Sequence, residues 1–248
     1  MTLRLHVLGS TGSWPKPNSP SSGYVVSNYD TRIILDLGFG TMPRLTEPLN
    51  VDAIVVSHRH ADHCADVLAL YHLWAYGEER KVGVPLVAPQ STLNSLAAFV
   101  EARSGNRFWE VFIADPVRHG DTRRVGTMHL EFFAVDHSVA SVSVRVVSEG
   151  RSLFYTGDTG TAGRWWDEVG RSDVVLAEAS WQGDGDDGDY TQHLTASEAG
   201  MIASDIGADR LIVTHLKPGL DPVRSVTEAK TTFHGPVSHA DPGLTIEV

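Results

Sequence analysis

Val55-Val56-Ser57-His58-Arg59-His60-Ala61-Asp62-His63 is the stretch that says most about this chain of 248 residues. The apolar run over residues 53–57 predicts a buried strand that ends in a burst of polar side chains. In an extended segment residues i and i+2 point the same way, so His58 and His60 can bind one metal ion together.

Asp62 and His63 lie at the turn into a helix, which apolar residues spaced along one face predict over residues 62–76. Because the two residues are adjacent, their side chains diverge and can face a second ion close to the first. Neutral imidazole and carboxylate groups are the ligands of Zn²⁺, and Mn²⁺ and Fe²⁺ accept the same set. A polar loop that happens to be rich in histidine is the alternative, but three histidines and one aspartate within six residues favour a metal site.

His-x-His-x-Asp-His is also the motif of the metallo-β-lactamase-fold hydrolases, which this chain resembles. The rest of that family's pattern occurs in order: a histidine after a strand (His137), a Gly-Asp turn after a strand (Asp158) and a histidine that ends a late strand (His215). The resemblance implies one ion held by His58, His60 and His137, a second held by Asp62, His63 and His215, and Asp158 bridging the two.

Strand and helix patterns follow one another along the whole chain without a linker or a short repeat. Their order favours sheets that helices cover on both outer faces. With the resemblance, this predicts an α/β (α+β) fold: a four-layer αββα sandwich of two mixed sheets flanked by helices, formed by residues 1–248 as a single domain. Besides the helix over 62–76, we expect helices over residues 91–102 with Ser91 as N-cap, 162–169, 196–206 and 222–233.

Composition limits the classes of protein that fit. Hydrophobic residues make up 42% of the chain, and no apolar run approaches the ~18 residues of a membrane span. With 20 Lys and Arg against 31 Asp and Glu, the net charge of −11 disfavours nucleic acid and anionic membranes as partners. A single cysteine, Cys64, excludes an internal disulfide and predicts a cytoplasmic protein, while a homodimer stays open.

A second constellation follows a predicted strand over residues 174–177, where Glu178 ends the strand and His193 precedes a helix. Thr195 and Glu198 form a capping-box pattern that starts this helix. A helix N-terminus favours anions, so a histidine there suits a phosphoryl oxygen or a departing alkoxide, with Glu178 orienting the ring. The alternative is that His193 only ends a loop.

The same pair resembles the phosphodiesterase branch of the superfamily, notably tRNase Z, in which a Glu after a strand and a His before a helix assist cleavage. The match is partial, because this chain has Ala177-Glu178-Ala179-Ser180 where that family usually has His-Glu-Ala-Thr. Residues 137 and 158 are only 21 positions apart, which leaves no room for the long arm that tRNase Z uses to hold tRNA. Pre-tRNA is therefore an unfavourable substrate.

The resemblance is closer to a compact actinobacterial-type group described as atypical class II cyclic-nucleotide phosphodiesterases. It rests on residues 19–24, 178–181, 193–201 and 228–230. It implies a hydrolase with two metal ions that acts on small phosphodiesters. The substrates that it implies are 3′,5′-cyclic nucleotides such as cyclic AMP, which are hydrolysed to 5′-nucleotides. Two ions would activate water near neutral pH, and a histidine would protonate the leaving ribose oxygen. The catalytic residues expected on this basis are His193, Glu178 and the ligand Asp62.

Two other function classes are alternatives. A thioesterase or lactamase on the same fold would act on a carbonyl and would not need His193. A binding protein that kept the fold would be expected to lose ligands, and the complete ligand set argues against it.

Other features allow a structural interpretation. The loop over residues 9–22 holds one charge and is expected to be ordered beside a site. The acidic segment 183–189 lacks the terminal Glu of a calcium loop and is expected to be a mobile loop near the site. Trp181 would stack on a base or lie half-buried in the core, and Arg59 would meet phosphate or be a surface charge. Structural positions are expected for Cys64, His6, His72, His119, His129, His234 and His239.

Overall fold

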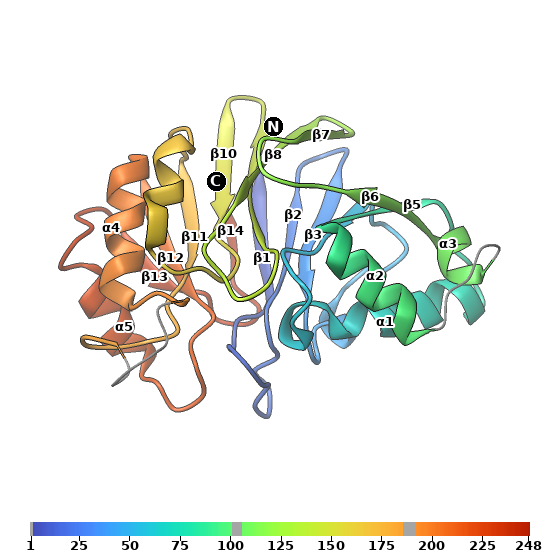
Figure 1. The fold of residues 1–248 in the computed structure, drawn as a ribbon, viewed down its shortest axis with the longest axis horizontal. Helices are drawn as coiled ribbons and strands as arrows, with labels where there is room; N and C mark the ends of the chain where they lie inside the picture. Colours follow the sequence, from blue (N-terminus) through green and yellow to red (C-terminus); the bar gives the residue numbers. More distant parts are fainter. Residues whose placement is uncertain (1, 101–105, 186–191) are drawn as a thin grey trace.

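The computed structural model describes residues 2–100, 106–185 and 192–248, and two seven-stranded sheets form its centre (Figure 1). In spatial order the first sheet consists of β14 (Thr245–Glu247), β1 (Arg4–Gly9), β2 (Gly23–Ser27), β3 (Arg32–Leu37), β4 (Ala53–Val55), β5 (Val84–Ala88) and β6 (Phe112–Pro116). The second consists of β13 (Val237–His239), β12 (Arg210–Thr214), β11 (Val174–Glu178), β10 (Arg151–Tyr155), β9 (Val142–Ser148), β8 (Met128–Ala134) and β7 (Thr122–Val125). The helical segments are α1 (Ala61–Tyr76), α2 (Gln90–Phe99), α3 (Arg107–Val111), α4 (Ala196–Ile206) and α5 (Pro222–Ala229), with 3₁₀ segments η1 (Met42–Arg44) and η2 (Ala162–Glu168). Among the described residues, no helix has the length and apolar character that crossing a membrane requires.

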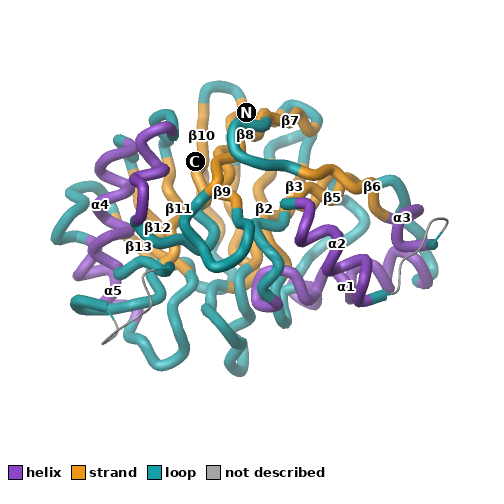
Figure 2. Tube along the Cα trace, in the orientation of Figure 1, coloured by secondary structure: helices purple, strands orange, loops and turns teal. Residues whose placement is uncertain are grey.

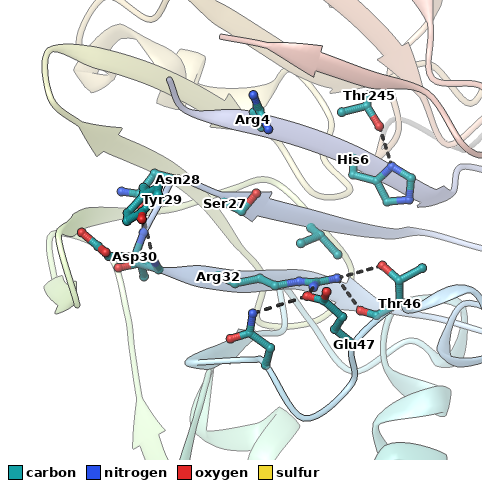
Figure 3. Close-up of a pocket in the computed structure, with 13 residues that line it drawn as sticks. Arg4, His6, Ser27, Asn28, Tyr29, Asp30, Arg32, Thr46, Glu47 and Thr245 are labelled. Carbon is teal, nitrogen blue, oxygen red and sulfur yellow. Dashed lines mark hydrogen bonds and ion pairs between the residues drawn. The ribbon is translucent and has the colours of Figure 1, made fainter. Parts of the chain in front are cut away.

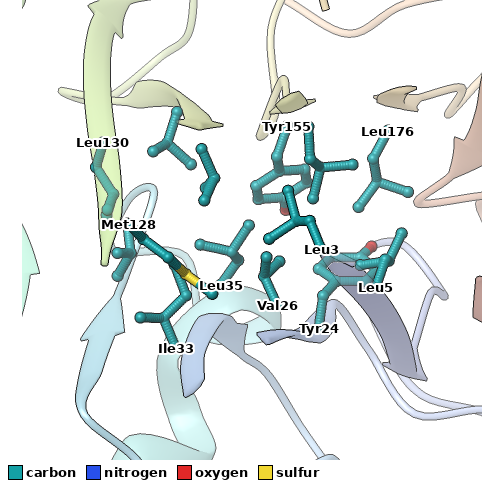
Figure 4. Packing of buried hydrophobic residues seen from close by; sticks show 14 of the residues in the cluster. Leu3, Leu5, Tyr24, Val26, Ile33, Leu35, Met128, Leu130, Tyr155 and Leu176 are labelled. Carbon is teal, nitrogen blue, oxygen red and sulfur yellow. The ribbon is translucent and has the colours of Figure 1, made fainter. Parts of the chain in front are cut away.

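Helices cover the outer face of each sheet, and the two sheets pack face to face (Figures 1 and 2). α1, α2 and α3 pack on the first sheet, whereas α4 and α5 pack on the second. Strand residues alternate between two buried faces: Ile33 and Leu35 of β3 point to the other sheet, while Ile34 packs under the helices. Figure 4 shows the core between the sheets, to which Leu130 and Leu176 of the second sheet contribute. The predicted αββα sandwich of two mixed sheets is confirmed.

Parallel strands of both sheets end at a shared edge of the sandwich. The strands from β3 to β6 are parallel neighbours, and so are the strands from β10 to β13. Ligand sites in α/β folds lie beyond the carboxyl ends of such strands. His58 and His60 follow β4, Asp158 follows β10 and His215 follows β12. The topology therefore brings together side chains that are far apart in the sequence.

Some helix boundaries differ from the sequence predictions. The prediction of Ser91 as N-cap is wrong. α2 begins at Gln90 and its N-cap is Pro89, so Ser91 already lies inside the helix. The predicted helix over 162–169 is the 3₁₀ segment η2, interrupted where Gly163 has a left-handed φ of 77°. α2 and α5 end at Phe99 and Ala229, before their predicted ends.

Candidate metal centre

The seven residues predicted to bind metal lie together at the shared edge of the sheets. Cluster one consists of His58, His60, His137 and Asp158, and cluster two of Asp62, His63, Asp158 and His215. Within each cluster the candidate ligand atoms lie within 4.8 Å of one another, so each cluster can surround one ion. The fold thus places these residues in the two groups that the family resemblance implies, with Asp158 in both.

Asp158 reaches the two clusters through different oxygen atoms. Its Oδ1 lies 3.1 Å from Nε2 of His63 and 3.4 Å from Nε2 of His215, both in cluster two. Its Oδ2 lies 3.7 Å from Nε2 of His58 in cluster one. A carboxylate placed in this way can bridge two cations.

Hydrogen bonds outside cluster two determine which ring nitrogens face inward. Asp36 Oδ2 accepts a hydrogen bond from Nδ1 of His63 at 2.7 Å. Ser180 Oγ donates to Glu178 Oε2 at 2.6 Å and therefore accepts from Nδ1 of His215 at 2.9 Å. In the neutral rings the Nε2 atoms of His63 and His215 then carry lone pairs, yet they face each other across 3.1 Å. A positive charge between the rings, either a metal ion or the proton of a charged His63, stabilises this arrangement, and partners behind the rings are typical of metal-binding histidines.

Cluster one has the same kind of support. Ser57 Oγ donates to Asp36 Oδ2 at 2.8 Å and so accepts from Nδ1 of His58 at 3.0 Å. The inward Nε2 of His58 is buried and has no hydrogen-bond partner among the described residues, which is costly unless a cation binds it. Nε2 of His137 likewise faces Nδ1 of His60 across 3.1 Å.

The ionisation of these groups also fits a cation site. Burial lowers the pKa of His58 well below its ordinary value and lowers the pKa of the other two histidines of cluster one, so these rings are neutral, as ligands must be. Burial opposes a charge on His63, but the surrounding carboxylates, that of Asp158 first, raise its pKa well above the ordinary value. The carboxylates of cluster two thus need a compensating positive charge, which a divalent ion would supply.

A third group, formed by Glu178, His193 and His215, adjoins cluster two. Oε1 of the buried Glu178 accepts from the backbone N–H of Thr159 at 2.7 Å and from Nδ1 of His193 at 2.9 Å. Burial opposes a charge on His193, yet the Glu178 carboxylate raises its pKa to about 9. α4 starts just after His193 with the predicted capping box at Thr195. Glu178 therefore stabilises a protonated histidine beside the clusters.

Comparison with known proteins agrees with this geometry. A family model described as the beta-lactamase superfamily domain matches residues 31–216. The chain belongs to the beta-lactamase superfamily. Its relatives include the uncharacterized protein ML1173 of Mycobacterium leprae, 33% identical over 100% of this chain and 89% of that protein. They also include the probable metallo-hydrolase YhfI of Bacillus subtilis, 26% identical over 99% of this chain and 100% of that protein.

Several solved structures share the fold of this chain over almost its full length. YhfI of Bacillus subtilis has a TM-score of 0.88 at 24% identity and covers 100% of both chains. The short form of human tRNase Z has a TM-score of 0.77 at 18% identity and covers 98% of both chains. Yeast PDE1 has a TM-score of 0.78 at 13% identity and covers 100% of this chain and 99% of its own. The relatives and the two clusters together identify this superfamily member as a metal-dependent hydrolase.

Asp36 is the main residue of the site that the sequence analysis missed. It is fully buried at the end of β3 and accepts hydrogen bonds from Ser57, His63 and Tyr155 at 2.7 to 2.8 Å. It also has a left-handed φ of 56°, which aspartate tolerates better than most residues. The signal in the sequence is an aspartate that ends an apolar strand, because burial makes an unpaired carboxylate costly there.

We expect Asp36→Asn to weaken metal binding roughly 10- to 100-fold, the cost typical of losing a partner behind a metal ligand. Asparagine fits the left-handed backbone, but it lacks the charge that holds His63 and Ser57 in place. Competition with a metal chelator measures the affinity, and thermal unfolding measured in parallel reports any loss of fold. Unchanged metal affinity in a folded variant would show that Asp36 does not support the site.

The remaining predictions concern residues around the site. Trp181 is half-buried, and the Lys217 ammonium lies 4.0 Å from its ring centroid. Arg59 is exposed, whereas Cys64 is buried in α1, as expected for a structural residue. Most of the acidic segment 183–189, which was predicted to be a mobile loop, lies outside the described residues. The six histidines for which the sequence predicts structural positions lie outside the three groups of candidate ligands that occur among the described residues.

Proposed function

We propose that this metallo-hydrolase is a phosphodiesterase that uses two divalent ions to hydrolyse small phosphodiesters. Its substrates are 3′,5′-cyclic nucleotides, above all cyclic AMP, and its products are 5′-nucleotides. The observation that carries this proposal is the pair of Glu178 and His193 beside cluster two. A protonated histidine in this position can protonate an alkoxide leaving group, which phosphodiester cleavage needs. The single cysteine fits a reducing compartment, and we propose the cytoplasm.

Two ions bound at the clusters, which we propose to be Zn²⁺ with Mn²⁺ or Fe²⁺ as alternatives, would activate water and polarise the phosphoryl group. Glu178 holds a proton on Nδ1 of His193, so the proton passed to the leaving 3′ oxygen comes from Nε2. The backbone N–H of Thr159 fixes Glu178 from the other side. Asp62 is a candidate ligand in cluster two, where its Oδ2 lies 3.2 Å from Nε2 of His215. We count it among the catalytic residues in this role as a ligand.

The preference for a small substrate rests on the segment between His137 and Asp158. β9 and β10 form a hairpin there, joined by Glu149 and Gly150, which both have the positive φ of a tight turn. The hairpin takes up the segment in which an RNA-holding arm would be inserted. The net charge of −11 further disfavours a long polyanion.

The Glu178→Gln variant tests the proposed proton donor through pH. His193 must be protonated to act as an acid, so activity falls as the pH rises through its pKa. The Glu178 carboxylate raises that pKa to about 9, and removing its charge lowers the pKa. We therefore expect the alkaline limb of the kcat profile to move to lower pH in the variant, measured at the same metal loading. An alkaline limb that stays in place would contradict this role of the pair.

A panel of substrates tests the proposed function. Metal-replete protein is given 3′,5′-cyclic AMP, 3′,5′-cyclic GMP, 2′,3′-cyclic AMP, a pre-tRNA transcript, a glutathione thioester and a β-lactam. We expect the 3′,5′-cyclic nucleotides to be turned over fastest. The similarity to human tRNase Z makes the pre-tRNA the main competitor. Processing of pre-tRNA far above the cyclic nucleotides would replace our proposal with an endoribonuclease, and turnover of the thioester or lactam alone would exclude a phosphodiesterase.

A further inference from the structure

The chain contains six tryptophans, and the rings of five of them pack against other parts of the protein. Trp74 and Trp166 are buried, and Trp109 and Trp165 pack against the cores beneath the helices. Trp181, one of whose two predicted roles is stacking on a base, is half-buried. The Lys217 ammonium lies over its ring, 4.0 Å from the ring centroid. The sixth, Trp14, leaves 51% of its surface exposed.

Trp14 lies on the loop between β1 and β2, and this loop is fixed to cluster two. The backbone N–H of Ser13 donates to Oδ2 of Asp62 at 2.7 Å. The N–H of Gly12 donates to the carbonyl of Leu216 at 3.0 Å. A Cβ at Gly12 would lie 2.9 Å from Nδ1 of His215, so only glycine lets the loop pass this close to the ring.

The position of Trp14 follows from these contacts. Ser13 has a left-handed φ of 63°, and the N–H of Trp14 then donates to the carbonyl of Gly12 at 2.7 Å, so the chain turns sharply at the cluster. The Cα of Trp14 is about 3.8 Å from the Cα of Ser13, whose amide contacts a candidate metal ligand. The backbone that carries the half-exposed indole of Trp14 is thus anchored beside the site where the phosphodiester would bind.

We propose that Trp14 stacks on the base of the nucleotide substrate and so selects nucleotides among small phosphodiesters. This inference rests on the proposed function and assigns it a residue for recognition of the base. An indole face binds any planar heteroaromatic base, because stacking does not need a particular pattern of hydrogen bonds. The site would therefore favour nucleotides over sugar phosphates but discriminate weakly between adenine and guanine.

Tyr29 provides a matched control. It is an exposed aromatic residue as well, with 82% of its surface accessible. It lies in the turn before β3, whereas Asp36 and the clusters lie at the other end of that strand, about 20 Å away at the usual rise per residue. Figure 3 shows it at the edge of a separate pocket of about 390 Å³, whose lining also includes Arg4, His6 and Arg32.

The test compares 3′,5′-cyclic AMP with the cyclic 3′,5′-phosphate of ribose that lacks the base. We expect Trp14→Ala to raise KM for cyclic AMP roughly 10- to 100-fold, from the strength of stacking on a single base. KM for the abasic substrate and kcat for both should stay the same. Trp14→Phe should recover most of the loss, and Tyr29→Ala should have no effect. An equal loss for the two substrates would overturn the inference, since Trp14 would then only shape the loop.

Fluorescence gives a second readout that does not need turnover. We expect 5′-AMP to quench the tryptophan fluorescence of the protein and ribose 5-phosphate to leave it unchanged. The quenching should disappear in Trp14→Phe and persist in Tyr29→Ala. Quenching that needs Trp14 supports the inference even if cyclic AMP is not hydrolysed, so failure of the proposed function is seen separately. Quenching that persists without Trp14 would overturn it.

Discussion

Replacing His193 with alanine should lower kcat for cyclic AMP roughly 10²- to 10⁴-fold, the usual contribution of a general acid. The ring is held by the buried Glu178 at 2.9 Å and adjoins His215 of cluster two. Because His193 belongs to neither cluster, metal content and thermal stability should stay close to those of the wild type. The exposed His129, which lies outside all three groups, offers a control in His129→Ala.

The identity of the leaving group shows whether His193 acts by proton transfer. A nitrophenolate leaves without protonation, so the loss in His193→Ala should be much smaller for a nitrophenyl phosphodiester than for cyclic AMP. Steady-state kinetics on the two substrates measures this difference. If both substrates lose the same factor, His193 positions the phosphate and does not donate the proton.

Replacing Asp158 with alanine should remove metal from both clusters at once. Its two oxygen atoms face different clusters, Oδ1 at 3.1 Å from His63 and Oδ2 at 3.7 Å from His58. We expect the metal content, measured by elemental analysis, to fall from about two ions per chain to well below one, because both sites lose a ligand. Activity should fall by more than the roughly 10- to 100-fold typical of losing a partner behind the ligands.

A matched variant separates the bridging role of Asp158 from a general effect of losing a buried carboxylate. Asp173 is also buried, but it accepts hydrogen bonds from the backbone and side chain of Ser152 and lies outside the clusters. Asp173→Ala should reduce thermal stability and leave the metal content at two. Loss of only one ion in Asp158→Ala, with the other fully bound, would contradict a bridging carboxylate.

The sequence, together with its resemblance to the family, was sufficient for the layers of the fold and for the groups of candidate ligands. His58 and His60 are spaced for one side of an extended segment, and Asp158 and His215 each follow a strand in recognisable turns. Their joint placement follows from parallel strands that end at one edge. Local pattern and topology therefore agree at this site.

The residues behind the ligands could not be found in this way. Tyr155 donates to Asp36 across the two sheets, over 119 positions of sequence, and no local pattern shows which strands of two sheets face each other. Ser180 matters because its hydroxyl joins Glu178 to His215, which depends on the register between β11 and β12. The edge strands β13 and β14 have three residues each, too few for a periodic pattern.

The products of cyclic AMP in ¹⁸O-labelled water, followed by ³¹P NMR, give the most direct test of the proposed phosphodiesterase. If His193 protonates the 3′ oxygen, the bond between phosphorus and that oxygen breaks. Metal-replete protein should then yield 5′-AMP with one ¹⁸O in its phosphate, and metal-free protein should yield no product. Formation of 3′-AMP would contradict the assigned leaving group, and recovery of intact cyclic AMP from protein with two bound ions would contradict the proposed function.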